Sequence, residues 1–206
     1  MKLPKIRELG EALKAIFTGP YTLKFPAGPP AETTKYYRGK PVPDDDYCVG
    51  CTACASVCPS KAIEVEDDPK KGIRKIIRRY DKCIYCGQCE RYCLTEKGVH
   101  LTQEWDLAGF KRDEMRYVQE KELVVCDRCG EVISTKQHLL WLAHKLGEMA
   151  YGNYPLILVS YDKLQIVKPA REKIEKEKPV TRQDFFRILC PKCKHIVILY
   201  DKYAIR

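Results

Sequence analysis

The chain has 206 residues, twelve of them cysteine, and a formal net charge of +9. This length accommodates one or two domains. The opening "MKLPKIRELGEALKAIF" interleaves charged and apolar residues, and nowhere do about eighteen apolar residues follow one another. The sequence therefore predicts neither an exported, disulfide-stabilised chain nor a membrane-spanning one, and we expect its thiols to be reduced.

Residues 1–43 are predicted to form an amphipathic helix followed by an extended arm. Apolar side chains recur at helical spacing, at Ile6, Leu9, Leu13, Ile16 and Phe17. Such a basic helix lies on an anionic membrane surface, or it packs on a neighbouring subunit or on the chain's own core. Six prolines and three glycines between residues 19 and 46 disfavour helix and strand interiors. We expect this stretch to lie along a partner as a docking arm; a disordered linker is the alternative.

Two dense cysteine runs follow in residues 44–104. Both have the spacing C-x2-C-x2-C-x3-C, at Cys48, Cys51, Cys54 and Cys58, and at Cys83, Cys86, Cys89 and Cys93. This spacing is typical of two-cluster bacterial ferredoxins, in which each [4Fe–4S] cluster takes four thiolates. Zinc knuckles are the alternative, but zinc spacings seldom place four cysteines in one such run.

The fourth cysteine of each run is expected to start a helix that points away from its own loop, and so to bind the other cluster. Cluster one is therefore assigned to Cys48, Cys51, Cys54 and Cys93, and cluster two to Cys83, Cys86, Cys89 and Cys58. Small residues in the loops, Gly50, Ala53 and Gly87, let backbone N–H groups approach the sulfurs. Pro59 follows Cys58, whereas Leu94 follows Cys93, which puts the local turn in question but not the ligand.

Between and after the runs we expect short strands. Ile63 and Val65 alternate with charges, "DDPKKG" is a turn, and residues 73–77 return as a second strand. "GVHLTQEW" after the second run mirrors the strand after the first. The ferredoxin domain is placed at residues 44–104.

Residues 105–206 are predicted to form a zinc-ribbon-like region with a helical insert. Two C-x2-C pairs, Cys126 with Cys129 and Cys190 with Cys193, are each flanked by β-rich apolar residues, and Gly130 permits the first turn. Four thiolates suit one tetrahedral zinc, which is favoured over a rubredoxin-type iron. The insert is expected to contain a helix at 135–152, a buried strand at 155–162 and a charged helix or loop at 168–186.

Four histidines are not expected to be ligands. His138 and His144 lie on the predicted helix away from the cysteine pairs, His195 lies in a loop, and His100 starts a strand. The predicted fold class is α+β: a two-cluster ferredoxin domain with an N-terminal docking arm and a C-terminal four-cysteine metal region.

These motifs resemble a known family. The sequence is similar to the chain of respiratory complex I that carries two [4Fe–4S] clusters and, more closely, to the small iron–sulfur subunit of formate hydrogenlyase and related membrane-bound NiFe hydrogenases. The resemblance rests on "RGKP" at 38–41, "CVGCTACASVCPSKAI" at 48–63, "KCIYCGQCERYC" at 82–93, "LTQEWDLA" at 101–108, and the later "CDRCG" and "CPKC".

The resemblance implies an electron-transfer subunit, peripheral on the cytoplasmic face of the cell membrane. Its expected partners are NiFe-type large and small subunits, an upstream ferredoxin or iron–sulfur donor, and membrane-arm subunits. The alternatives are a soluble two-cluster ferredoxin, or a wire in a related sulfur-reducing complex. We expect no catalysis by the chain itself and no small-molecule substrate, because no nucleophile elbow, phosphate loop or dinucleotide fingerprint is present.

The positive charge raises the question of nucleic acid. The basic residues are scattered and often adjoin Glu or Asp, as in "REKIEKEK", and no aromatic stacking module is evident. An iron–sulfur protein that binds nucleic acid is therefore the least supported alternative.

Overall fold

A computed structural model describes residues 5–19, 22–164 and 181–199. The chain divides into two compact units, residues 1–37 and 38–206. None of the helices within the described ranges has the length and apolar character needed to cross a bilayer. Most of the charged stretch expected at 168–186 lies outside the described residues. The domain boundaries at 43/44 and 104/105 stay predictions.

In the first unit, the expected amphipathic helix is present as α1 (Ile6–Thr18). It ends at Gly19, whose φ of 72° lies in the left-handed region that favours glycine. None of its residues is buried, and its apolar side chains are all exposed. Within the described residues of this first unit, nothing covers the apolar face of the helix.

The described residues of the second unit form two antiparallel sheets. The smaller pairs β1 (Pro41–Pro43) with β4 (Val99–Leu101). The larger has the order β2 (Ile63–Asp68), β3 (Ile73–Arg79), β5 (Arg116–Val125) and β6 (Val132–Thr135). The hairpin expected around "DDPKKG" is confirmed, with Ile63 opposite Arg78 and Asp68 opposite Ile73.

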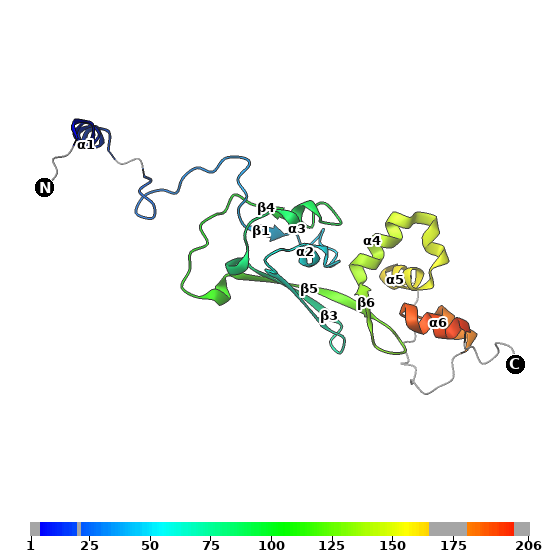
Figure 1. Ribbon diagram of the computed structural model, residues 1–206. Coiled ribbons are helices and arrows are strands. Elements are labelled where there is room, and N and C mark those ends of the chain that lie inside the picture. The colour runs from blue at the N-terminus through cyan, green and yellow to red at the C-terminus, as the bar shows by residue number, and fades with distance from the viewer. Residues whose placement is uncertain (1–4, 20–21, 165–180, 200–206) are drawn as a thin grey trace. The chain divides into compact units, whose positions relative to one another are not determined.

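Short helices and turns complete this unit. The α-helices are α2 (Ala53–Ser56), α3 (Gln88–Arg91), α4 (Lys136–Leu146), α5 (Tyr154–Leu164) and α6 (Pro191–Leu199). The 3₁₀ turns are η1 (Tyr80–Lys82), η2 (Arg112–Glu114), η3 (Gly147–Gly152) and η4 (Arg182–Phe186). In Figure 1, α4, α5 and α6 gather beyond the β6 end of the larger sheet, while α2 and α3 lie near β1 and β4.

Several local expectations from the sequence are wrong. Residues 155–162 form helix α5, not a strand, because a short apolar run does not distinguish a strand from a buried helix. Leu156 and Val159 lie three residues apart and are both buried, in the same apolar cluster as Leu139 of α4. Pro155 in the first turn is compatible with this helix, since its missing N–H has no helical partner there.

The second C-x2-C pair is not flanked by strands. Pro191 begins α6 directly after Cys190, and Cys193 lies inside the first turn of that helix. Proline is favoured at a first helical position because its fixed φ suits the helix. Only the first pair therefore lies in a β-hairpin, in the connection between β5 and β6.

The fourth cysteine of each run comes just after the end of a helix and does not start one. Cys54 lies within α2 and Cys58 follows its end; Cys89 lies within α3 and Cys93 follows that helix.

The arm is also not wholly free of regular structure. Its last residues form β1, whose prolines are tolerated because β1 is a short edge strand.

Candidate electron-transfer site

The two cysteine loops repeat one backbone conformation. Gly50 and Tyr85, the third residues of their runs, have φ of 71° and 54°, and Thr52 and Gly87, the fifth residues, have φ of 68° and 77°. Left-handed conformation costs on the order of 1 kcal/mol for a residue with a side chain. A left-handed residue next to one of ordinary conformation turns successive backbone N–H groups toward a common concavity that favours anions. The loops are therefore shaped to surround negatively charged sulfur.

The first cavity lies inside the first loop. Its lining includes Cys48, Cys51, Cys54 and Cys93. Ile76 of β3 and Val99 of β4 form apolar walls and are both almost completely buried. The structure thus brings Cys93 of the second run to the three leading cysteines of the first run.

The second cavity has the reciprocal composition. Its lining includes Cys58, Cys83, Cys86 and Cys89. Two backbone N–H groups donate to its sulfurs: Ala62 to Cys58 Sγ at 3.3 Å and Tyr85 to Cys83 Sγ at 3.4 Å. Four thiols, apolar walls and N–H donors aimed at sulfur are the donor set of a [4Fe–4S] site. The residues present fit that group in both cavities.

Burial determines the protonation of most of these thiols. It raises the pKa of Cys54 and Cys83, and raises that of Cys89 to about 11. Burial also tends to raise the pKa of Cys58. Hydrogen bonds from Ser60 and from backbone N–H groups outweigh this effect, so the pKa of Cys58 is lowered. Most of the buried thiols therefore need a positive partner before they ionise, as binding of an iron–sulfur core requires.

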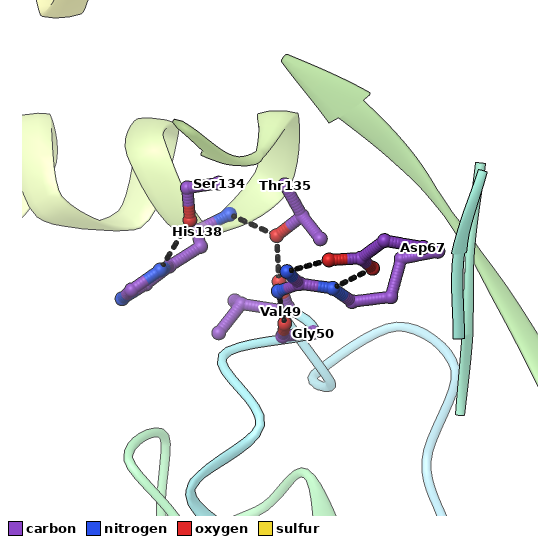
Figure 2. Close-up of polar contacts among 7 residues, drawn as sticks. Val49, Gly50, Asp67, Ser134, Thr135 and His138 are labelled. Atoms are coloured by element: carbon purple, nitrogen blue, oxygen red, sulfur yellow. Dashed lines mark hydrogen bonds and ion pairs between the residues drawn. The ribbon is translucent and has the colours of Figure 1, made fainter. Parts of the chain in front are cut away.

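The first loop is held from outside by two side chains of the larger sheet (Figure 2). Arg74 on β3 donates from Nη1 to the carbonyl oxygen of Gly50 at 2.9 Å, and it pairs with both carboxylate oxygens of Asp67 at 2.7 Å. Thr135 donates its hydroxyl hydrogen to the carbonyl oxygen of Val49. These contacts satisfy two carbonyl groups that the irregular loop leaves without regular partners.

A polar network from β5, on the same face of the sheet as Arg74, supports the residues just before this loop. Asp45, three residues before Cys48, accepts hydrogen bonds from Tyr117 Oη at 3.0 Å and from Gln119 Nε2. Lys121 donates to its carbonyl oxygen at 2.7 Å. The three donors alternate along β5 and so share one face of the sheet. The hydrogen bond from Gln119 lowers the pKa of the Asp45 carboxyl, against the effect of burial.

The sequence interpretation missed Arg78, which lines both cavities. Its side chain is 2% exposed, and Nη2 lies 4.0 Å from Cys54 Sγ. The signal was present in the strand pattern "IRKIIRR", in which Arg78 has the same parity as the buried Ile76. A charged residue at an inward position of a strand is unusual enough to mark a site.

The four remaining cysteines also meet. The sulfur atoms of Cys126, Cys129, Cys190 and Cys193 all lie within 4.8 Å of one another. Cys129 Sγ and Cys190 Sγ are 3.7 Å apart, near the ~3.8 Å between sulfurs that tetrahedral zinc–thiolate bonds imply. Within the described residues this group includes no histidine, and His100, His144 and His195 are exposed. His195 lies in helix α6, so its predicted position in a loop is wrong. The arrangement fits one four-coordinate metal ion.

Comparisons with known proteins agree with this chemistry. A family described as a 4Fe-4S dicluster domain matches residues 47–97, which include all eight cysteines of the two runs. NADH-quinone oxidoreductase subunit I 2 of Geobacter metallireducens is 34% identical over 131 residues, which are 60% of this chain and 98% of the relative. Formate hydrogenlyase subunit 6 of Escherichia coli is 37% identical over 115 residues, 55% of this chain and 61% of that protein.

Among solved structures, a chain of the membrane-bound sulfane sulfur reductase, described as an archaeal respiratory membrane complex, is similar. It is 27% identical and has a TM-score of 0.40, covering 56% of this chain and 61% of that chain.

Fold, cavities and cysteine pattern define a two-cluster ferredoxin-type iron–sulfur protein. The chain belongs to the complex I-related family represented by NADH-quinone oxidoreductase subunit I and formate hydrogenlyase subunit 6. It is an iron–sulfur electron-transfer subunit.

Proposed function

We propose that this chain carries single electrons between an upstream iron–sulfur donor and the NiFe-type large and small subunits of a membrane-bound hydrogenase or complex I-related complex. The observation that carries the proposal is the pair of neighbouring cavities, each lined by four cysteines from both runs. Iron–sulfur clusters exchange one electron at a time. The protein contributes their spacing, their insulation from water and the tuning of their potentials.

The ligand sets follow the cavity linings. Cluster one is held by Cys48, Cys51, Cys54 and Cys93, and cluster two by Cys83, Cys86, Cys89 and Cys58. Because each run contributes its fourth cysteine to the other cavity, neither loop completes a site alone. Contact between α2 and α3, which contain Cys54 and Cys89, supports a short path between the clusters.

The third metal centre is a structural zinc. Cys126 and the helix-borne Cys193 are buried, and the backbone N–H of Cys193 donates to Cys190 Sγ at 3.5 Å. Four thiolates without an open position suit a structural role and not a catalytic one. The metal joins the β5–β6 hairpin to the start of α6, through cysteines such as Cys129 and Cys190 that lie 61 residues apart in the sequence.

The first unit provides the docking element. Leu9 and Leu13 are 56% and 52% exposed on the apolar face of α1. A helix with such a face is suited to a partner subunit or to the interface of an anionic membrane. We place the chain at the cytoplasmic face of the membrane as a peripheral subunit, with membrane-arm subunits as neighbours.

The deciding experiment is an anaerobic pull-down of the chain from detergent-solubilised membranes, with the bound subunits identified by mass. Recovery of a NiFe-type large subunit and antiporter-like membrane subunits is expected. Recovery of the chain alone, from the soluble fraction, would instead establish a diffusible ferredoxin. Recovery with the subunits of a sulfur-reducing complex would reassign the terminal acceptor.

A pair of variants tests the docking element in the same assay. Leu9→Gln with Leu13→Gln removes apolar area from the exposed face of α1 and should reduce recovery of the partner subunits. Lys14→Gln, on the polar face of that helix, is the matched control and should leave recovery close to the wild-type level. Equal recovery from both variants would remove α1 from the proposed interface.

A further inference from the structure

Arg78 lies in the wall that separates the two cysteine cavities. It extends from β3 with only 2% of its surface exposed. Of the described residues that line either cavity, it is the one common to both. Any charge on its guanidinium group therefore acts on two sites at once and at short range.

The guanidinium group has few polar partners. Nη1 donates to Gln119 Oε1 at 3.3 Å, and Nη2 lies 4.0 Å from Cys54 Sγ. Nε is buried and has no hydrogen-bond partner within the described part of the chain. The nearest acid in this network is Asp45, which is reached only through the side-chain amide of Gln119. Among residues 5–19, 22–164 and 181–199, no carboxylate forms an ion pair with Arg78.

This arrangement is unfavourable for the chain alone. Arginine stays protonated in proteins, and a buried charge without an adjacent counter-charge is costly. An apolar residue of similar volume would avoid this cost. A compensating negative charge is therefore expected in the remaining surroundings of Arg78, and these are the two cavities lined by cysteine.

A [4Fe–4S] core ligated by four thiolates supplies that negative charge when it is bound, and its reduction by one electron makes the charge more negative. The guanidinium group then interacts more strongly with the reduced state than with the oxidised state on either side. An electron that leaves one cavity for the other remains close to the same cation. Arg78 itself gives up no proton and no electron in this transfer.

We propose that the buried positive charge of Arg78 raises the reduction potentials of both clusters. Because the same charge acts on both, it also keeps the two potentials close to each other. The inference rests on the proposed ligation of two clusters by the eight cysteines. Gln119 and Asp45 keep the guanidinium group in place: the amide of Gln119 accepts from Arg78 and donates to Asp45. The loop that precedes Cys48 thus helps to orient the cation.

The test is a potentiometric titration of the purified full-length chain, followed by electron paramagnetic resonance, for the wild type and for Arg78→Gln. Glutamine keeps a polar group opposite Gln119 and removes the charge. Both clusters should become harder to reduce by about tenfold in the one-electron equilibrium constant, which corresponds to about 59 mV toward negative potential. Iron and sulfide contents are measured on the same samples.

Two further variants keep the result interpretable. Lys75→Gln removes a positive charge from the same strand, at a side chain that is 44% exposed and paired with Glu120, and it should leave both potentials unchanged. Arg78→Lys retains the charge and should restore most of the wild-type potential. Unchanged potentials in Arg78→Gln, or an equal shift in Arg78→Lys, would overturn the proposal.

Cluster content separates this inference from the proposed function. If the wild-type chain itself binds fewer than two clusters, the ligand assignment fails, and the role of Arg78 fails with it. If the wild type binds two clusters but Arg78→Gln and Arg78→Lys both lose them, Arg78 has a packing role and the electrostatic proposal is wrong. If only Arg78→Gln loses them, the buried charge is needed to hold the clusters, and the proposal that it sets the potentials of clusters bound without it is wrong.

Discussion

The hydroxyl of Thr135 donates its hydrogen to the carbonyl oxygen of Val49, inside the first cysteine loop, and its oxygen accepts from the backbone N–H of His138. Thr135 is the N-cap of α4 and is completely buried. One side chain therefore both starts a helix of the four-cysteine region and supports the loop proposed to hold cluster one. The two metal regions are coupled through this residue.

Thr135→Val should weaken both connections while it preserves the shape of the side chain. Loss of the cap and of the bond to Val49 should destabilise the second unit by about 1–2 kcal/mol. The midpoint of thermal unfolding of the cluster-loaded chain should fall, and its visible absorbance should decay faster. Ser160→Ala removes a hydroxyl that donates to the carbonyl oxygen of Leu156 within α5, and it should have a smaller effect. Equal effects would argue against the coupling.

Gly50→Ala should be more damaging than the equivalent change at Gly72. Both glycines have φ near 70°, at 71° and 70°, so both changes carry the cost of a left-handed residue, on the order of 1 kcal/mol. A Cβ at Gly50 would also lie 2.9 Å from Thr135 Cγ2, whereas nothing lies within 4 Å at Gly72. Iron content and thermal unfolding should decrease clearly for Gly50→Ala and little for Gly72→Ala. The reverse order would contradict the packing of Thr135 on this loop.

Single cysteine variants test the exchange of ligands between runs. Cys93→Ala should damage cluster one, although its sequence neighbours bind cluster two, and Cys58→Ala should damage cluster two. The cavity linings provide the reason. Electron paramagnetic resonance of the reduced variants distinguishes the two signals. Damage confined to the cluster of the same run in either variant would refute the assignment.

Metal analysis tests the four-cysteine site. The wild-type chain should contain about eight iron, about eight labile sulfide and about one zinc, from the ligand counts. Cys126→Ser with Cys193→Ser should remove the zinc and leave the iron unchanged, because the four sulfurs form a group separate from the two cavities. Iron in this site in place of zinc would change the metal but not the ligands. A chain with no metal there would contradict the structural centre.

His138 should make stability sensitive to mildly acidic pH. Burial, followed by the nearby Arg74, lowers the pKa of His138 below the ordinary value of 6.5. The unfolded chain therefore takes up a proton more readily than the folded chain. The contribution to stability is present above pH 6.5 and is lost as the pH falls through the lower folded-state pKa.

The measurement is the unfolding midpoint at about pH 7.5 and at about pH 5.5, a range in which histidine changes charge. His138→Gln should reduce the difference between the two midpoints. His144→Gln, at an exposed position on the same helix, should leave it unchanged. A full wild-type difference in His138→Gln would assign the pH dependence to another group.

Much of the site could be predicted because its chemistry is local in sequence. The spacing of the cysteines in each run is the spacing that a loop needs to surround a cluster. Helix α1 and the β2–β3 hairpin followed from periodicity and from turn residues. Predictions failed where a short apolar segment suited two structures, as at α5 and around Cys193. There tertiary packing chose the helix.

The sequence by itself determined the iron–sulfur character of the protein, because four closely spaced thiols leave few alternatives to a cluster. Only the tertiary structure decided which groups surround the cysteines. The pairing of β3 with β5 brings Gln119 to Arg78. The position of the start of α4 places its N-cap residue, Thr135, beside Val49. These partners lie 41 and 86 residues apart. No local pattern encodes such contacts, since they depend on strand register and on how helices pack against the sheet.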